Sequence, residues 1–236
     1  MRVERINSPV VSLAEVSKIF GSNSHTTAAV RDVTLQFSLG ELVVLLGPSG
    51  SGKTTLLTLI AGLIEPTWGR VTLFGEDVVT YPTRKLQELR AQRLGFVFQD
   101  FLLIDSLTAM ENVAMVLRFA GSSKFAARRQ AKRLLEDFHI AHLTDKYPDR
   151  LSQGEKQRVA IARAIANDAD LIIADEPTAS LESTQGFDII QLLHRYAKER
   201  NKCVIVATHD LRIVDLADRV LRLEDGMIGA HRTESK

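Results

Sequence analysis

A glycine-rich loop between an apolar run and a helical pattern limits this chain to a small set of folds. The loop matches G-x-x-x-x-G-K-[ST] and consists of Gly47, Pro48, Ser49, Gly50, Ser51, Gly52, Lys53 and Thr54. It directly follows the continuous apolar run 42–46, which predicts a parallel strand buried on both faces. A helical pattern opens at Thr55, directly after the loop. A strand, a loop and a helix in this order are typical of a phosphate-binding loop.

The residue types in this loop explain how it would hold a nucleoside triphosphate. Glycines let backbone N–H groups point at the phosphates, and the helix N-terminus adds the positive end of its dipole. Lys53 is expected to meet the β- and γ-phosphates, the Thr54 hydroxyl to bind Mg²⁺, and Thr55 to complete the nucleotide contacts. The alternative is a glycine-rich turn before a core helix. Typical residue frequencies put a chance match on the order of one per cent for such a chain.

Two further apolar runs end in polar residues that suit phosphate chemistry. Run 171–174 is followed by Asp175 and Glu176, and run 203–207 leads to His209. Ligands bind at the carboxyl ends of the strands in open α/β sheets, so these side chains are expected beside the loop. Asp175 is suited to holding Mg²⁺, Glu176 to orienting or deprotonating an attacking water, and His209 to contacting the γ-phosphate. The alternatives are solvated acids that cap a strand, and a structural histidine.

The order of apolar patterns indicates an α/β fold with one antiparallel part. Strand-length apolar runs alternate with longer helical patterns, which is the signature of α/β architecture. Segments 10–16, 30–37 and 70–74 look half-exposed, as strands of an antiparallel sheet do. The middle of the chain, 108–143, has apolar residues at helical spacing and is predicted to be mostly helical.

The helical middle is interpreted as an insertion into one domain that covers residues 1–236. No linker rich in Gly, Ser or Pro isolates it from the rest of the chain. The nucleotide-binding core with its β subdomain is expected at about 10–98 and 165–230, and the helical subdomain at about 100–164.

Charge and composition exclude several classes of protein. The chain of 236 residues has 30 Lys and Arg against 29 Asp and Glu, a formal net charge of +1, which gives no electrostatic case for a nucleic-acid partner. Cys203 is the single cysteine, so no intramolecular disulfide can form. No apolar stretch approaches the roughly 20 residues that a membrane-spanning helix needs, and the first residues lead into no signal-peptide pattern. These features predict a soluble, intracellular globular chain.

One local charge cluster stands out in this balanced composition. It consists of Lys124, Arg128, Arg129, Lys132 and Arg133, within the helical middle. Its ordinary interpretation is the solvated face of one helix, and the alternative is a surface that docks a partner or anionic lipid.

Two further motifs give the chain a resemblance to a known family. Residues 151–158 read LSQGEKQR and resemble the signature LSGGQxQR, and residues 175–178 read DEPT. On these motifs the chain resembles the ATP-binding subunits of ABC transporters, from about Val11 to Ile228. It looks most similar to the subunits that power lipoprotein release, macrolide export and the division-site complex. That similarity rests on residues 95–99, 107–113 and 174–178.

The resemblance implies a P-loop NTPase fold: a RecA-like parallel sheet core, an antiparallel β subdomain and an inserted helical subdomain that carries the signature. It implies that Gln99 ligates Mg²⁺ and reports the nucleotide state to the helical insertion. Phe20 would stack on the adenine, with a core aromatic as the alternative interpretation. Glu182 would lie in the loop that crosses a dimer interface, and His209 would contact the γ-phosphate.

The signature has a physical logic of its own. Ser152 and Gly154 precede a stretch of good helical character, and a helix N-terminus is a ready anion site. In the family, this second site completes the ATP site of the opposing subunit. The residues implied are Leu151, Ser152, Gln153, Gly154 and Glu155. The structural alternative is a plain N-cap followed by a surface helix.

The chain departs from the family pattern in the signature and the crossing loop. Gln153 stands where the family favours Gly, Glu155 where it favours Gln, and Glu182 where it favours Asp. We expect an altered rate or dimer affinity, with hydrolysis retained.

The resemblance also implies how the chain works. Two copies would bind two Mg·ATP and hydrolyse ATP, on the cytoplasmic face of the cell membrane. They would drive a separate permease, with export or lipoprotein and lipid extraction favoured. The loop 100–104 carries apolar residues that either contact that permease or pack the helical insertion onto the core. Two alternatives stay open: a soluble ABC ATPase of the iron–sulfur assembly type, and a nucleotide-gated scaffold with little hydrolysis.

Overall fold

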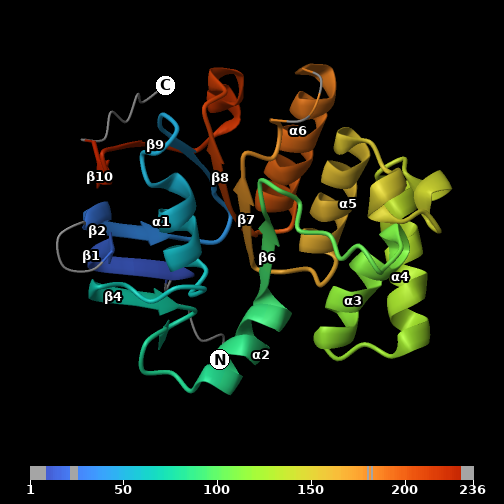
Figure 1. Cartoon of the computed structure of the whole chain (residues 1–236), viewed down its shortest axis with the longest axis horizontal. Helices are drawn as coiled ribbons and strands as arrows, with labels where there is room; N and C mark the ends of the chain where they lie inside the picture. The colour runs from blue at the N-terminus through green and yellow to red at the C-terminus, as the bar shows by residue number, and fades with distance from the viewer. Residues whose placement is uncertain (1–8, 22–25, 180, 182, 230–236) are drawn as a thin grey trace, which may run out of the picture.

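The structure is a computed structural model that describes residues 9–21, 26–179, 181 and 183–229. Its centre is a six-stranded sheet, seen nearly edge-on in Figure 1. From one edge to the other the strands are β10 (Met227–Ile228), β9 (Arg219–Glu224), β3 (Leu42–Leu46), β8 (Cys203–Thr208), β7 (Leu171–Asp175) and β6 (Leu94–Val97). All neighbouring pairs are parallel except β10 with β9. The carboxyl ends of β3, β7 and β8 therefore meet at one edge of the sheet.

A second, smaller sheet is antiparallel and packs beside the first. Its order is β2 (Thr27–Phe37), β1 (Val11–Phe20), β4 (Trp68–Leu73) and β5 (Glu76–Asp77). Helix α1 (Lys53–Ile60) lies between the two sheets and shares one buried cluster with both of them. Helix α2 (Thr83–Arg93) then leads from the small sheet into β6.

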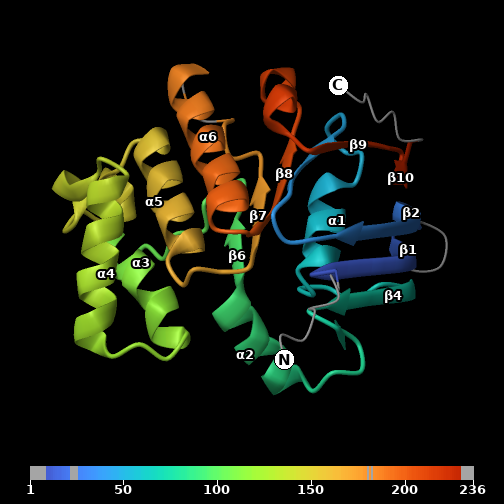
Figure 2. The same cartoon turned by 180° about the vertical axis from the view of Figure 1, so that it is seen from behind.

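The helices of the second half cover the other face of the central sheet. They are α3 (Ala109–Phe119), α4 (Lys124–Asp137), α5 (Gln153–Ile165) and α6 (Ser183–Glu199), with short 3₁₀ turns at Ala141–Leu143, Pro148–Arg150 and Leu211–Leu216. Seen from behind in Figure 2, α5 and α6 lie against the sheet, and α3 and α4 form a hairpin beyond α5. Alternation along β3 feeds both layers: Leu42, Val44 and Leu46 face this helical layer, and Val43 and Leu45 face α1.

Strand β6 and helix α5 approach each other unusually closely. A Cβ added at Gly95 would lie 1.9 Å from the backbone oxygen of Ala164. No other residue fits there without moving backbone, so the glycine fixes the distance between this edge strand and the signature helix.

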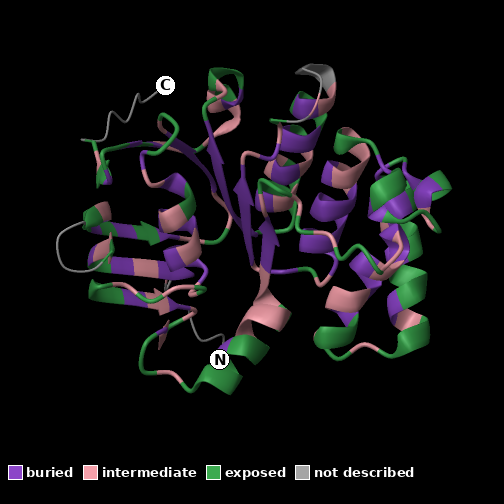
Figure 3. Cartoon of the chain, in the orientation of Figure 1, coloured by how far each residue is buried: buried purple, intermediate pink, exposed green. Residues whose placement is uncertain are grey.

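The predicted fold class is confirmed, including the buried parallel strands and the antiparallel part. As Figure 3 shows, the strands β3, β7 and β8 are purple throughout, while much of α4 is green and α3 is green only at its C-terminal end. The structure extends the predicted strands 10–16 and 30–37 into β1 and β2, and the predicted helical middle contains α3 and α4. Within the described ranges, no helix is both long and apolar enough to cross a membrane.

Candidate functional site

A polar pocket of about 440 Å³ lies at the carboxyl ends of β3, β7 and β8. It brings together the glycine-rich loop, the acidic pair Asp175 and Glu176 at the end of β7, and His209, which follows β8. The lining residues are Ala29, Ser49, Gly50, Gly52, Lys53, Thr54, Thr55, Gln99, Asp175, Glu176, Ala179 and His209. Segments far apart in the sequence thus meet where open α/β sheets bind their ligands.

The glycine-rich loop owes its shape to two glycines. Gly52 has a φ of 101°, and a Cβ there would lie 2.1 Å from the oxygen of Ala29. Gly50 has a φ of 80°, and no atom of the described residues lies within 4 Å of the position its Cβ would take, so the glycine is required for conformation rather than for space. The chain therefore turns tightly into α1, which begins at Lys53.

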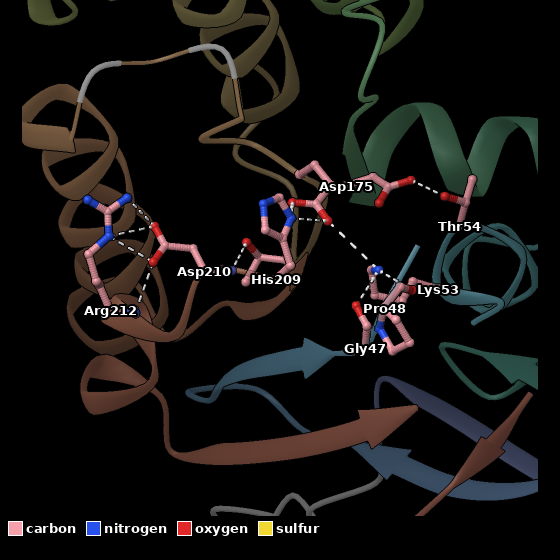
Figure 4. Close-up of polar contacts among 10 residues, drawn as sticks. Gly47, Pro48, Lys53, Thr54, Asp175, His209, Asp210 and Arg212 are labelled. Carbon is pink, nitrogen blue, oxygen red and sulfur yellow. Dashed lines mark hydrogen bonds and ion pairs between the residues drawn. The ribbon is translucent and has the colours of Figure 1, made fainter. Parts of the chain in front are cut away.

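Lys53 is the buried cation of the pocket. Its Nζ donates to the backbone oxygens of Gly47 and Pro48, at 2.7 and 3.1 Å, as Figure 4 shows. The same Nζ lies 3.8 Å from Oε1 of Glu176. An ammonium held across the loop can meet an anion on one side and a carboxylate on the other.

Thr54 and Asp175 join the loop to β7. The Thr54 hydroxyl donates to Asp175 Oδ2 at 2.6 Å (Figure 4). Burial raises the pKa of the Asp175 carboxyl; the Thr54 hydrogen bond lowers it in part, and the nearby Glu176 raises it further. Because burial disfavours the charged carboxylate, a divalent cation at this point would relieve the cost.

The donor set at this point fits Mg²⁺. A hydroxyl from Thr54, a carboxylate from Asp175 and the amide of Gln99 all line the pocket. Mg²⁺ prefers oxygen donors and takes only one or two protein carboxylates when phosphates supply further ligands. The chemistry of the side chains and their convergence therefore suit the ion.

Glu176 and His209 form a contact pair beside the lysine. Nδ1 of His209 lies 3.1 Å from Oε1 and 3.0 Å from Oε2 of Glu176. Glu176 has a φ of 49°, and its backbone N–H donates to Ala207 on the neighbouring strand at 2.9 Å. This left-handed conformation re-aims the chain after β7, and the carboxylate reaches the pocket.

Hydrogen bonds of the next residue, Asp210, fix the position of His209. The backbone N–H of Asp210 donates to the Thr208 hydroxyl at 3.0 Å. Arg212 donates to both carboxylate oxygens of Asp210, as Figure 4 shows, and this hydrogen bonding holds the pKa of Asp210 below its usual range. The turn that presents the histidine is therefore built by local hydrogen bonds.

The signature residues 151–155 lie at the start of α5, outside the pocket lining. Ser152 is the N-cap: its hydroxyl accepts from the N–H of Glu155 at 3.3 Å, and Glu155 Oε2 accepts from the N–H of Ser152 at 2.7 Å. The backbone hydrogen bond from Ser152 is the main cause that lowers the pKa of Glu155. Because a capping box accepts either Glu or Gln at this position, the departure at Glu155 keeps the helix start intact.

Two predicted positions lie apart from this geometry. Phe20 ends β1, is 45% exposed and is not among the pocket-lining residues, with Lys18 Nζ 5.3 Å from its ring centroid. Its interpretation as a buried core aromatic is therefore wrong, and its contact with adenine stays a prediction. Glu182 lies outside the described residues.

Sequence reasoning missed two buried polar residues that shape the loop after Gln99. Arg163 of α5 donates to the backbone oxygens of Phe101 and Leu102, both at 2.6 Å, and these two residues have φ values of 60° and 46°. Asn112 of α3 is fully buried; its Oδ1 accepts from the N–H of Ile104 and its Nδ2 donates to the oxygen of Leu107. Both side chains stand on otherwise apolar helix faces, and that is the signal which marks them.

The fold and the site together define a P-loop NTPase. The sequence model of the family described as "ABC transporter" matches residues 30–179. The chain belongs to the ABC transporter family, as an ATP-binding protein and ATPase.

Individual relatives agree with this assignment. An uncharacterized ABC transporter ATP-binding protein of Thermotoga maritima is 41% identical over 219 residues, which cover 93% of each chain. The solved structure of the ATP-binding cassette MJ0796 of Methanocaldococcus jannaschii, a dimer bound to ADP and Pi in a post-hydrolysis state, has a TM-score of 0.89 and 38% identity. That match covers 93% of this chain and 97% of the other.

A further solved structure is more distant. CbiO1 from Clostridium perfringens, described as part of the ABC transporter complex cbiONQ, has a TM-score of 0.79 and 29% identity. The match covers 94% of this chain and 88% of CbiO1. The similarity therefore extends over nearly the whole chain in each case.

Proposed function

We propose that this chain is the ATP-hydrolysing subunit of a transporter, and that two copies close head to tail around two Mg·ATP. The observation that carries the proposal is the placement of the signature. A chain with its own pocket at Lys53 has a second, capped helix N-terminus at Ser152 that does not line this pocket. Because a helix N-terminus attracts anions, this second site would bind the phosphates of the nucleotide that the partner holds.

The proposed roles follow the geometry of the pocket. Backbone groups of the glycine-rich loop and Lys53 hold the phosphates, with Ser49, Gly50, Gly52 and Thr55 on the pocket wall. Thr54, Gln99 and Asp175 would hold Mg²⁺, which would neutralise charge on the phosphates. Phe20 would stack on the adenine.

Glu176 is proposed as the group that takes a proton from the attacking water. Its carboxylate lies between the ammonium of Lys53 and the imidazole of His209. His209 would orient this carboxylate and contact the γ-phosphate. Positioning and electrostatics of this kind supply most of the catalysis in phosphoryl transfer.

A homodimer is supported by the relatives as well as by the signature. MJ0796, which matches this chain over nearly its full length, forms a dimer in its ADP- and Pi-bound structure. In such an arrangement Gln153, Gly154 and the proposed crossing loop with Glu182 would complete the partner's site. A Cβ on Gly154 would lie 3.3 Å from the Leu181 side chain, so the backbone at this point is already closely packed.

A separate membrane permease is the proposed recipient of the motion. CbiO1 is described as part of a transporter complex. Leu102 and Ile104 present apolar side chains, 55% and 39% exposed, from the loop that follows Gln99. The chain would then sit on the cytoplasmic face of the membrane, and its motifs favour export or lipoprotein and lipid extraction.

Replacing Glu176 by glutamine tests the catalytic assignment. The variant should bind ATP and form a stable dimer because the amide keeps the shape but cannot accept the proton. Its steady-state phosphate release should fall by about two to four orders of magnitude, the range typical of a lost general base. Light scattering with ATP measures the dimer, and Lys53→Ala is the control that should lose nucleotide affinity instead. Full turnover in the glutamine variant would remove Glu176 from this role.

The permease is tested by purification of the full chain from detergent-solubilised membranes of its own host, in the presence of ATP. Co-purification of a multi-span membrane protein supports the transporter role. Recovery of soluble partners alone would favour a soluble ABC ATPase.

A further inference from the structure

The tip of the α3–α4 hairpin exposes two phenylalanines. Phe119 ends α3 and is 70% exposed, and Phe125 lies in the first turn of α4 and is 77% exposed. They are the most exposed large hydrophobic side chains among the described residues. Two exposed aromatic side chains on either side of one short connection between helices call for an explanation, because burial of an aromatic ring is favourable.

The tip and the helix α4 that leads away from it carry a strong local charge. Between Asn112 and Leu135 the chain carries six basic residues and no acidic one, while the whole chain has a net charge of only +1. The basic residues are Arg118, Lys124, Arg128, Arg129, Lys132 and Arg133. Over the whole hairpin, residues 109–137, three acidic residues (Glu111, Glu136 and Asp137) reduce the net charge to +3, and the remainder of the chain has a net charge of −2.

Helix α4 separates these residues from the core. Ala127, Ala131 and Leu135 are fully buried on its inner face. Arg129 stands on the outer side with its guanidinium 6.0 Å from the ring centroid of Phe125. The helix therefore presents an aromatic and basic face to the outside at helical spacing.

Most of these charges have no counter-ion on the protein. In the described ranges, Lys124, Arg129, Lys132 and Arg133 take part in no ion pair, whereas Arg128 lies 3.8 Å from Glu111. The cluster is therefore not explained by a network of internal salt bridges, which would leave it electrostatically neutral.

We propose that the tip with Phe119 and Phe125, together with the exposed basic residues of α4 that lead away from it, binds the surface of an anionic lipid bilayer. Basic side chains attract the phosphates of anionic headgroups, and neighbouring aromatic rings suit the interface between headgroups and acyl chains. Six basic side chains beside two exposed rings complement an anionic surface that also offers an apolar layer beneath it. The tip lies at the end of the helical layer away from the carboxyl ends of the strands, as Figures 1 and 2 show. Lipid contact would therefore leave the pocket free.

This inference goes beyond the proposed function because it requires neither hydrolysis nor a permease. Co-sedimentation of the full chain with vesicles tests it directly. The vesicles are phosphatidylcholine alone, or phosphatidylcholine with phosphatidylglycerol at one third of the lipid. The native chain should bind the anionic vesicles several-fold more strongly, and added salt should weaken the binding because charge attraction is screened.

Two paired variants separate the contributions. Arg129→Glu with Lys132→Glu should lower the partition into anionic vesicles by at least about tenfold. Phe119→Ala with Phe125→Ala should lower it several-fold, also at high salt. The matched controls are Arg195→Glu, an exposed arginine on α6, and Trp68→Ala, an exposed aromatic on β4, and both should bind as the native chain does. ATP hydrolysis should be unchanged in all four because none of these residues lines the pocket.

Three results would overturn the proposal. They are equal binding to neutral and anionic vesicles, equal losses in the tip variants and their controls, and no vesicle binding by the native chain. Loss of permease association in the tip variants, without any vesicle binding, would assign the tip to an acidic protein segment instead.

Discussion

Replacing Asn112 by alanine removes a side chain that holds the segment between Gln99 and α3 in place. Asn112 Oδ1 accepts from the N–H of Ile104 at 2.8 Å. Its Nδ2 donates to the oxygens of Ile104, Leu107 and Thr108, each at 3.1 Å. One fully buried amide therefore contacts four backbone groups, with the two hydrogens of Nδ2 shared among three acceptors.

The cost follows from what each partner retains. The oxygens of Ile104 and Thr108 keep a second donor, the N–H groups of Leu107 and Asn112 respectively. The N–H of Ile104 and the oxygen of Leu107 lose the partner that the asparagine supplies. A buried backbone group without a hydrogen-bond partner costs about 1–3 kcal/mol, and water relieves part of this cost. The two groups together give a loss of about 3 kcal/mol in the free energy of unfolding.

Urea unfolding followed by far-UV circular dichroism measures this loss. With a slope of about 2.5 kcal/mol per molar urea, the midpoint should fall by about 1 M. Asn167→Ala is the control: among the described residues its side chain makes a single hydrogen bond, to the oxygen of Ala91 at 2.8 Å, and its Oδ1 has no partner there. That variant should lose about 1 kcal/mol or less. Equal midpoint shifts for the two variants would refute this accounting of hydrogen bonds.

Three further substitutions test packing, charge and capping. Gly95→Ala should lower the free energy of unfolding by about 3 kcal/mol or more in a urea titration. The new Cβ would lie 1.9 Å from the backbone oxygen of Ala164, and neither atom can move away without a shift of the backbone. Asp175→Asn should raise the melting temperature of the ligand-free protein at neutral pH. Burial raises the pKa of Asp175 in the folded state, so ionisation of this carboxyl destabilises the native chain as pH rises above its ordinary pKa. Below about pH 4 the carboxyl is protonated in both the folded and the unfolded state, and the stability gained by the asparagine variant should vanish. Glu155→Gln should lower the melting temperature only slightly: glutamine also completes the capping box with Ser152, but it lacks the charge that the lowered pKa of Glu155 shows to be favoured in the fold. Glu155→Ala should lose about 1 kcal/mol, and a loss with glutamine as large as that with alanine would contradict the capping argument.

The sequence predicted the pocket well because its parts stand at the ends of strongly apolar strands. Runs such as Leu42–Leu46 and Leu171–Asp175 are buried over their full length, and parallel strands bring their carboxyl ends together. Once those runs are recognised, Lys53, Asp175 and His209 must converge. The fold class followed from the same patterns.

The parts that escaped prediction depend on tertiary contacts. Strand β6 has only four residues and contains Gly95, whose role comes from the approach of α5 rather than from any local pattern. Phe20 reads as a core residue by type, yet it lies exposed at the end of its strand. Asn112 and Arg163 stand out as polar residues on apolar helix faces, but their partners are backbone groups of the segment 101–108, whose positions the residue types do not specify.

The contacts around Gln99 have a mechanical consequence for the signature. Helix α5 is fastened near its C-terminal end, by the close approach at Gly95 on one side of Gln99 and by Arg163 on the other. Its N-terminal end, at Gln153, lies about 16 Å further along the axis at 1.5 Å per residue and packs with the helical layer rather than with the sheet. A swing of about 10° about that fastening would therefore carry the signature through about 3 Å, the length of one hydrogen bond. A small rotation of α5 about its contacts near Gln99 would therefore produce a larger displacement at the signature.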